Sequence, residues 1–270
     1  MKQAVFIGNC QAAAIQQCLK YSNFYEKYTS KYYANWQMIE SKSAPPITDL
    51  ANADLVVYQP LSDVHGCYST NPHNPKSMLS VCKSDAVLVS FPRIHNNSIW
   101  PIFKKHRYKS FYYGDEFLKY YMDKGVTKIE DFLRLYDSNE LNFFFNERYE
   151  RNKKISVERE LETDIKVWDF LESNWHNKQL FLTQDHPTTH VFSHVVKQLC
   201  DIIDVELYFD LELLGKNFAG LPDSTYDFAS NELPLSNYSI VGHNFNWTTE
   251  MNEPFYKNEL VNYCKMAGLN

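Results

Sequence analysis

Residues 4–19 read AVFIGNCQAAAIQQCL, and this stretch decides the fold. Its first four residues, Ala4–Ile7, form a short and continuously apolar run, which is typical of a strand covered on both faces of a parallel sheet. Gly8 and Asn9 end the run, and the alanine-rich residues from Gln11 to Leu19 favour a helix that packs on that sheet. The chain is therefore predicted to open with a strand, a tight turn and a helix.

The same alternation recurs along the chain, with a late helix expected from about Thr188 toward Cys200. Strands that alternate with helices predict an α/β fold, an open and mostly parallel sheet flanked by helices. Ligands of such sheets bind outside the carboxyl ends of the strands. Further strands are expected at Ala53–Tyr58, Asp85–Phe91 and Gln179–Thr183, with a weaker one at Tyr32–Ile39. The candidate ligand-binding segments, which follow the strands, are Gly8–Gln11, Gln59–Leu61, Pro92–Asn97 and Gln184–His190.

The chain has 270 residues, a length that suits one large domain or one domain with an appended lobe. Between residues 108 and 177 the composition changes to aromatic and charged helical stretches, including Ile129–Tyr136 and Val157–Leu171. This region is predicted to be a helical insertion, and two interpretations stay open: a lid over the site, or a helical layer of the same domain. Residues 232–246 are expected to be loop-rich, and residues 254–266 to form a closing helix.

Composition excludes several classes of protein. A hydrophobic share of 44% and an aromatic share of 16% exclude a disordered chain, and the net charge of −6 argues against binding to nucleic acid. The six cysteines are widely spaced without a CxxC pair, so free thiols in a reducing compartment are expected. Polar residues interrupt the first twenty positions, and no window is apolar enough for a membrane span. We therefore expect a cytoplasmic protein without an integral membrane segment.

Cys10 is the cysteine that the pattern singles out, because it lies one residue past the first strand, in the turn Gly8-Asn9-Cys10-Gln11, and directly before a helix. Unpaired N–H groups and the helix dipole at such a position favour the thiolate, the reactive form of cysteine. The same N–H groups could stabilise an oxyanion. The alternative is a small buried side chain in a tight turn.

A thiol nucleophile needs a base, and His186 is the histidine best placed for that role. It follows a predicted strand, and Pro187 suits the first turn of a helix. If both strands are parallel, His186 lies on the same sheet edge as Cys10; otherwise it caps the helix or binds a nearby carbonyl. Asp185 is expected to be a helix cap rather than the group that orients this imidazole. The segment HPTTHVFSH repeats histidine every four residues but carries no carboxylate, so no metal site is predicted.

Two other strand ends carry polar side chains. Gln59 could donate to an oxyanion through its amide, and Arg93 could pair with a phosphate through its planar fork. Either side chain could instead satisfy loop carbonyls. The sequence has no GxGxxG and no GxxxxGKS, so the common dinucleotide and P-loop sites lack their phosphate cradle.

These residues resemble a known family. Gly8-Asn9-Cys10-Gln11 after the first strand, Gln59-Pro60-Leu61 after a later strand, and His186-Pro187-Thr188 before a late helix are similar to motifs of the WcbI-type polysaccharide biosynthesis proteins. The resemblance spans most of the chain in order but gives no match for residues 108–177 or the last forty. It implies a coenzyme A-binding acetyltransferase of bacterial capsule synthesis, with a three-layer fold like that of SGNH (GDSL-like) hydrolases.

The resemblance also implies roles for single residues. Cys10 would stand where SGNH hydrolases have their nucleophilic serine, His186 would be the general base, and Gln59 an oxyanion-hole residue. The sequence departs from the SGNH pattern at Thr183, where an Asp is usual, so a Cys–His dyad without an acid is implied.

We therefore expect acetyl-CoA or another acyl-CoA as donor and a sugar hydroxyl as acceptor. Two alternatives stay open: a thiol esterase or thioesterase that uses water as acceptor, and a non-catalytic binder of glycans or nucleotides. Asn9, Gln11, Arg93 and His95 are the residues expected to contact the coenzyme.

Overall fold

The computed structural model describes residues 1–96, 98, 114–138, 140–142, 144–175, 178, 180–183, 185–214, 257, 260–262, 264–265 and 268–270. These residues fall into two compact units. The described parts of Met1–His95, Ile155–Trp175 and Gln179–Thr225 form the first, and those of Asn96–Lys154, His176–Lys178 and Tyr226–Asn270 form the second. No helix among the described residues is long and apolar enough to cross a membrane.

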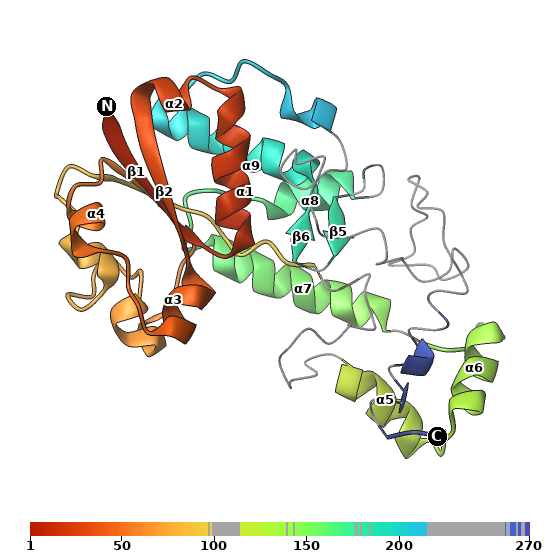
Figure 1. Cartoon of the computed structure of the whole chain (residues 1–270). Coiled ribbons are helices and arrows are strands. Elements are labelled where there is room, and N and C mark those ends of the chain that lie inside the picture. The colour runs from red at the N-terminus through yellow and green to blue at the C-terminus, as the bar shows by residue number, and fades with distance from the viewer. Residues whose placement is uncertain are drawn as a thin grey trace. The chain divides into compact units, whose positions relative to one another are not determined.

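The first unit is built on a four-stranded sheet in the order β2-β1-β3-β4 (Figure 1). Every pair of neighbouring strands is parallel, which confirms the predicted α/β class. Gly8 lies opposite Ala34, and Tyr58 lies between Ile7 and Ser90, so the carboxyl ends of all four strands meet at one edge. The strands are β1 (Lys2–Gly8), β2 (Tyr28–Ala34), β3 (Leu55–Tyr58) and β4 (Val87–Ser90).

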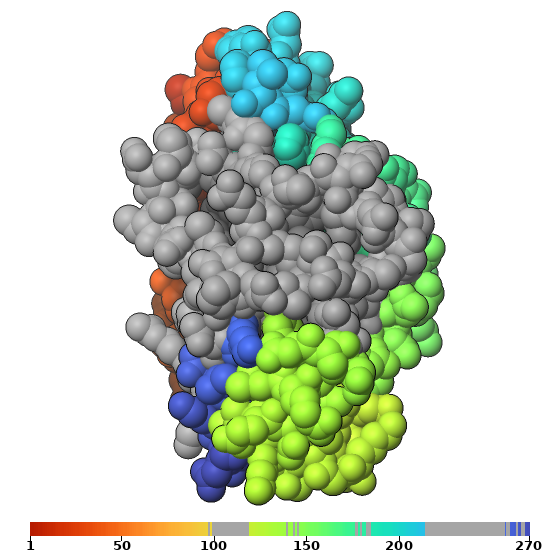
Figure 2. Space-filling view, turned by 90° about the vertical axis from the view of Figure 1, so that its right-hand side faces the viewer, coloured from red at the N-terminus to blue at the C-terminus, as the bar shows by residue number. Residues whose placement is uncertain are grey.

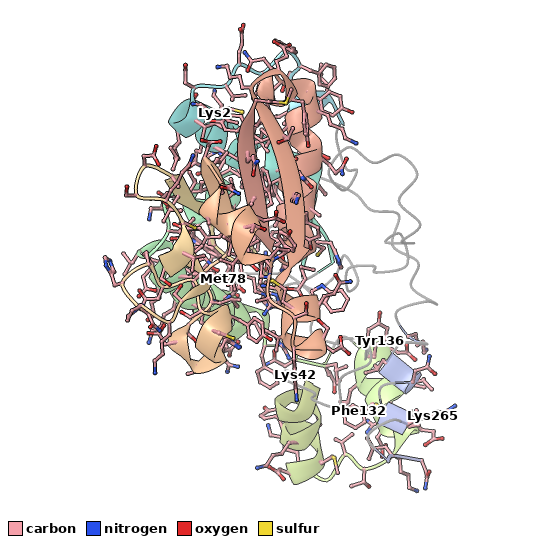
Figure 3. All side chains as sticks on the ribbon, turned by 60° about the vertical axis from the view of Figure 1, so that its left-hand side comes forward. Lys2, Lys42, Met78, Phe132, Tyr136 and Lys265 are labelled. Atoms are coloured by element: carbon pink, nitrogen blue, oxygen red, sulfur yellow. The ribbon has the colours of Figure 1, made fainter. Side chains whose placement is uncertain are left out.

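Helices cover both faces of this sheet, as the continuous apolar run of β1 predicts. On one face, Val5 and Ile7 pack with Met38, Leu50 and Met78. Met78 is labelled in Figure 3. These three partners come from α3 (Asn35–Ser41), α4 (Ile47–Ala51) and the short helix η3 (Met78–Val81).

On the other face, the ring of Phe6 meets that of Phe24 at 6.0 Å in an edge-on contact. The helices on this side are α1 (Cys10–Cys18), the short η1 (Leu19–Tyr21), α2 (Phe24–Lys27) and α9 (Thr189–Ile203), which packs on α1. Eight residues of α9 are buried, among them Val191, Val195 and Leu199, at helical spacing. The chain then ends its described part in the first unit with η4 (Leu211–Leu214).

The second unit contains α5 (Gly114–Asp123), α6 (Ile129–Asp137) and the first part of α7 (Phe145–Glu160). Phe132 is fully buried and meets Tyr121 edge-on at 5.6 Å. The described C-terminal residues lie against α6 (Figure 2), where Ile129 N donates to Asn270 O at 3.2 Å. The predicted helix at Ile129–Tyr136 is thus confirmed.

Three expected elements differ in the structure. The stretch Tyr32–Ile39 is the end of β2 followed by α3, and the break comes at Ala34. Val157–Leu171 is not one helix but the end of α7 and the start of α8 (Trp168–Asn174), because the Glu160 carboxylate accepts from Val167 N and Trp168 N and caps the second helix.

The third difference is Gln179–Thr183. Its described part, β5 (Phe181–Thr183), pairs antiparallel with β6 (His186–Pro187) and stands outside the four-stranded sheet. Pro187 is therefore in a strand and not in the first turn of α9. The loop-rich region expected at 232–246 and most of the helix expected at 254–266 lie outside the described residues, and the single-domain expectation stays a prediction.

Candidate functional site

Gly8 is required at the end of β1 because α1 and β3 approach it closely. A Cβ at this position would lie 2.9 Å from the Ala12 Cβ and 3.3 Å from the Gln59 Cβ. The next residue, Asn9, caps α1, since its Oδ1 accepts from Gln11 N at 2.9 Å. The GNCQ sequence therefore lets the chain turn sharply from strand to helix while α1 stays tight against the sheet.

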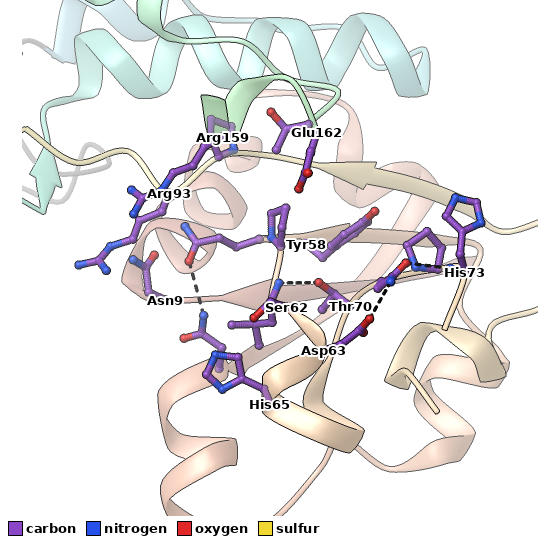
Figure 4. A pocket seen from close by; sticks show the side chains of 18 of the residues that line it. Asn9, Tyr58, Ser62, Asp63, His65, Thr70, His73, Arg93, Arg159 and Glu162 are labelled. Atoms are coloured by element: carbon purple, nitrogen blue, oxygen red, sulfur yellow. Dashed lines mark hydrogen bonds between the residues drawn. The ribbon is translucent and has the colours of Figure 1, made fainter. Parts of the chain in front are cut away.

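The strand order places a ligand crevice at this turn. From β1 the chain crosses to β2 on one side, whereas β3 lies on the other side, so the topological switch point falls between β1 and β3. A cavity of about 1060 Å³ lies there, lined by Asn9 after β1 and by Gln59 after β3 (Figure 4). Its size is that of a cofactor or substrate site.

Gln11 ties together the loops that follow three different strands. Its fully buried amide donates from Nε2 to Ile94 O at 2.5 Å and to Asp185 O at 2.9 Å, and its Oε1 accepts from Ile94 N at 3.0 Å. Gln59 Nε2 also donates to this Oε1, at 3.4 Å. The polar atoms of this side chain are thus engaged by the neighbouring loops, and the contact with the coenzyme that the sequence leads us to expect for Gln11 stays a prediction.

Asp185 is not a helix cap, contrary to the sequence-based expectation. The residue before α9 is Thr188, and the Asp185 carboxylate instead accepts from Arg93 Nη2 at 2.8 Å and contacts His95 Nδ1 at 2.9 Å. Burial opposes the charge of Asp185, but hydrogen bonds and charge from His95 and Arg93 outweigh it and hold its pKa well below the usual range. Arg93 and His95 are therefore brought together by one carboxylate, and Arg93, half exposed, lines the cavity.

The surroundings of Cys10 favour the thiol over the thiolate, contrary to the expectation from its position before α1. Burial, and to a smaller extent the nearby Asp185 charge, raise the pKa of the Cys10 thiol to about 11. Backbone N–H groups and Arg93 lower this pKa, but by less than burial and Asp185 raise it. Half-buried beside Asn9, the side chain is thus held protonated at neutral pH.

His186 and Cys10 do not share the edge of one parallel sheet. His186 lies opposite Thr183 in the antiparallel β5–β6 pair. It follows Asp185, and the Asp185 carbonyl accepts a hydrogen bond from Gln11, the residue next to Cys10. His190 and His194 lie on α9, and His194 stacks on Phe170. Among the described residues there is no cluster of three or more metal-ligating side chains. Two residues of the expected strand-end segments, Asn97 and Gln184, lie outside the described residues.

Sequence reasoning missed a latch that joins the segment after α7 to the end of β4. The Asp164 carboxylate accepts from Ser90 N and Ser90 Oγ, both at 2.7 Å, and Ser90 Oγ accepts from Asp164 N at 2.9 Å. This latch brings Arg159 and Glu162 to the cavity wall (Figure 4). The signal was hidden because residues 157–171 resemble one continuous helix.

A parallel α/β sheet with a glycine turn, a cysteine and converging amides at its switch point defines an α/β protein with an enzyme-like ligand site. Residues 3–207 match the family model described as polysaccharide biosynthesis enzyme WcbI, and the chain belongs to this family. No curated protein sequence matches the chain.

A solved structure shares the fold, with a TM-score of 0.60 and 15% identity over 98% of this chain and 90% of that one. It is described as WcbI, a novel polysaccharide biosynthesis enzyme, in its native form without a disulfide bond between coenzyme A and one of its cysteines.

Proposed function

We propose that the protein transfers an acyl group, of which acetyl is the simplest case, from coenzyme A to a sugar hydroxyl in the synthesis of a bacterial capsule or other surface polysaccharide. The observation that carries the proposal is the place of Cys10, which is the first residue of α1 and follows Asn9, a residue that lines the cavity of about 1060 Å³ at the sheet's switch point. Family membership supports the polysaccharide, and the description of the solved WcbI supports the coenzyme. The cytoplasm stays the expected compartment, and an SGNH-like active site stays part of the proposal.

Cys10 would mark the position of the coenzyme sulfur. A cysteine that can form a disulfide with coenzyme A must lie within bonding distance of that sulfur, and Cys10 directly follows Asn9, which lines the cavity. Because burial raises its pKa to about 11, Cys10 is a poor nucleophile without a base. This favours direct attack of the sugar hydroxyl on the thioester over an acyl-cysteine intermediate.

In that reaction the sugar oxygen bonds to the thioester carbonyl carbon, the carbon–sulfur bond breaks, and coenzyme A leaves as its thiol. A base takes the hydroxyl proton and returns it to the leaving sulfur. We propose His186 as this base and His95 as the alternative, because the Asp185 carboxylate contacts His95 Nδ1 at 2.9 Å and would hold this imidazole in one orientation. Gln59, whose amide is buried at the cavity wall, would donate to the oxyanion.

The coenzyme contacts follow from charge. Among the described residues that line the cavity, Arg93 and Arg159 are cationic, and both would pair with phosphates. Asn9, which lines the cavity beside Cys10, would contact the thiol arm.

A mixed-disulfide experiment tests where the coenzyme binds. Oxidised coenzyme A, the symmetric disulfide, exchanges with a nearby protein thiol, leaving one coenzyme on the cysteine and releasing one as free thiol. We expect a coenzyme adduct on Cys10 that competes with added acetyl-CoA. Cys82, which is half-buried like Cys10 but does not line the cavity, serves as the control for non-specific exchange. An adduct on Cys82 and none on Cys10 would contradict the proposed coenzyme site.

Turnover with acetyl-CoA and a panel of sugar acceptors tests the chemistry. We expect coenzyme release that depends on the sugar, no acetyl adduct on Cys10 by intact mass, and loss of turnover in either His186→Ala or His95→Ala, whichever carries the proton. Release without any sugar would instead indicate a thioesterase. Unchanged turnover in both histidine variants would refute a histidine base.

A further inference from the structure

The cavity has two walls of different chemistry. Toward one side lie Arg93 and Arg159, and toward the other lie Asp63, Thr70 and His73 (Figure 4). Within the described lining the second wall carries no lysine or arginine, so it offers hydrogen bonds without positive charge. A neutral ligand rich in hydroxyl groups suits such a wall better than a phosphate does.

This second wall includes an aromatic platform. Trp36, near the start of α3, lines the cavity and leaves 47% of its surface exposed. α3 packs against η2 (Asp63–Tyr68), whose His65 also lines the cavity. A large flat apolar ring left open beside polar groups is the usual support for the C–H face of a sugar ring.

The polar part of the wall is held rigid before any ligand arrives. The Asp63 carboxylate accepts from Ser69 Oγ at 2.7 Å, Asn71 Nδ2 at 3.0 Å and Asn74 Nδ2 at 2.7 Å. These three bonds hold the pKa of Asp63 below its usual value. Thr70 Oγ1 accepts from Leu61 N at 2.7 Å, which closes the base of the same loop. Preorganised groups lower the entropy cost of binding a flexible ligand.

The platform is also connected to the reacting end of the site. Asn35, the neighbour of Trp36, donates from Nδ2 to Gln59 Oε1 at 3.5 Å, and Gln59 in turn contacts Gln11 next to Cys10. A ring stacked on Trp36 would therefore present a hydroxyl near the proposed oxyanion donor.

We infer that Trp36, together with the Asp63-braced loop at His65 and Asn71, is the binding subsite for the sugar ring of the acceptor. The inference rests on the proposed acyl transfer for the identity of the ligand as acceptor. It assigns the arginine wall to the coenzyme and the tryptophan wall to an uncharged pyranose.

Fluorine NMR of protein labelled with 5-fluorotryptophan tests this subsite. The chain has five tryptophans, and Trp36→Phe identifies the Trp36 signal by its loss. The probes are methyl glycosides of mannose, glucose and galactose at tens of millimolar, and, separately, coenzyme A and adenosine 3′,5′-bisphosphate. We expect a saturable shift of the Trp36 signal with at least one glycoside and none with the bisphosphate.

Variants sharpen the result. Trp36→Ala is expected to weaken glycoside binding, followed on the other tryptophan signals or by calorimetry, by about tenfold or more, as for an aromatic anchor. Ile39→Ala changes an exposed residue of the same helix that does not line the cavity, and should leave binding unchanged.

A Trp36 shift with coenzyme A or the bisphosphate but with no glycoside would overturn the inference, and so would no shift with any probe. Thermal shift with coenzyme A separates the two proposals. Stabilisation by coenzyme A without glycoside binding refutes the sugar subsite alone. Glycoside binding without any coenzyme effect leaves the sugar subsite standing and refutes the coenzyme-dependent function.

Discussion

Replacing Gln11 by methionine should destabilise the first unit far more than its place in a short helix suggests. Methionine keeps the buried volume but removes the hydrogen bonds to Ile94 O, Ile94 N and Asp185 O, at 2.5, 3.0 and 2.9 Å. Each lost bond costs about 0.5–1.5 kcal/mol, and more where a buried partner is left unsatisfied. We therefore expect a loss of about 2–4 kcal/mol in the free energy of unfolding.

Urea unfolding followed by circular dichroism measures this loss, and Gln16→Met is the matched control. Gln16 lies on the same helix but is only partly buried, and its side chain donates a single bond, to Ser30 Oγ at 2.8 Å. The control should cost no more than about 1 kcal/mol. If the two variants differ by less than about 0.5 kcal/mol, Gln11 does not hold the strand-end loops together as described.

Three further changes test neighbouring parts of the site. Gly8→Ala should destabilise by about 1–3 kcal/mol, because its Cβ would lie 2.9 Å from the Ala12 Cβ, and thermal unfolding measures this; a neutral result would show that α1 can shift away. Asp185→Asn should lower the pKa of Cys10 and speed its alkylation by iodoacetamide at pH 8, because the Asp185 charge raises that pKa. Peptide mass spectrometry that resolves Cys10 measures the rate of alkylation. Slower alkylation in the variant would contradict the effect of the Asp185 charge on the Cys10 pKa. The same variant should have a lower free energy of unfolding than the wild type above pH of about 4, where only the wild type has the ionised carboxylate. This difference in free energy should disappear as acid protonates Asp185. A difference that stays constant with pH would contradict the lowered pKa. Asp164→Ala should weaken coenzyme A binding in calorimetry by releasing Arg159 from the cavity wall, whereas unchanged affinity would show that the Ser90 latch is not needed for the site.

The parallel sheet and its first turn were predictable from sequence because they depend on local patterns. Apolar runs at Ala4–Ile7, Ala53–Tyr58 and Asp85–Phe91 give β1, β3 and β4, and the carboxyl-edge rule leads to Asn9 and Gln59 at the cavity. Periodicity of this kind reports how each segment is covered, not which distant segment it touches.

The parts that sequence missed depend on long-range contacts. The Asp185 carboxylate meets residues some ninety positions earlier, and the Asp164 latch spans 74 positions to Ser90. The raised pKa of Cys10 was missed for a related reason, because the helix terminus is visible in the sequence whereas burial and the Asp185 charge are not.

The Gln11 contacts also set an order of assembly during synthesis. The four strands of the sheet are complete at Ser90, so this sheet can form while the rest of the chain is still being made. Asp185, the last partner of Gln11, leaves the ribosome roughly ninety residues later, a delay of about 5 to 20 s at ordinary rates of synthesis. During that interval the Gln11 amide lacks one of its acceptors and α9 is not yet packed on α1, so the nascent protein carries the sheet before its site is assembled.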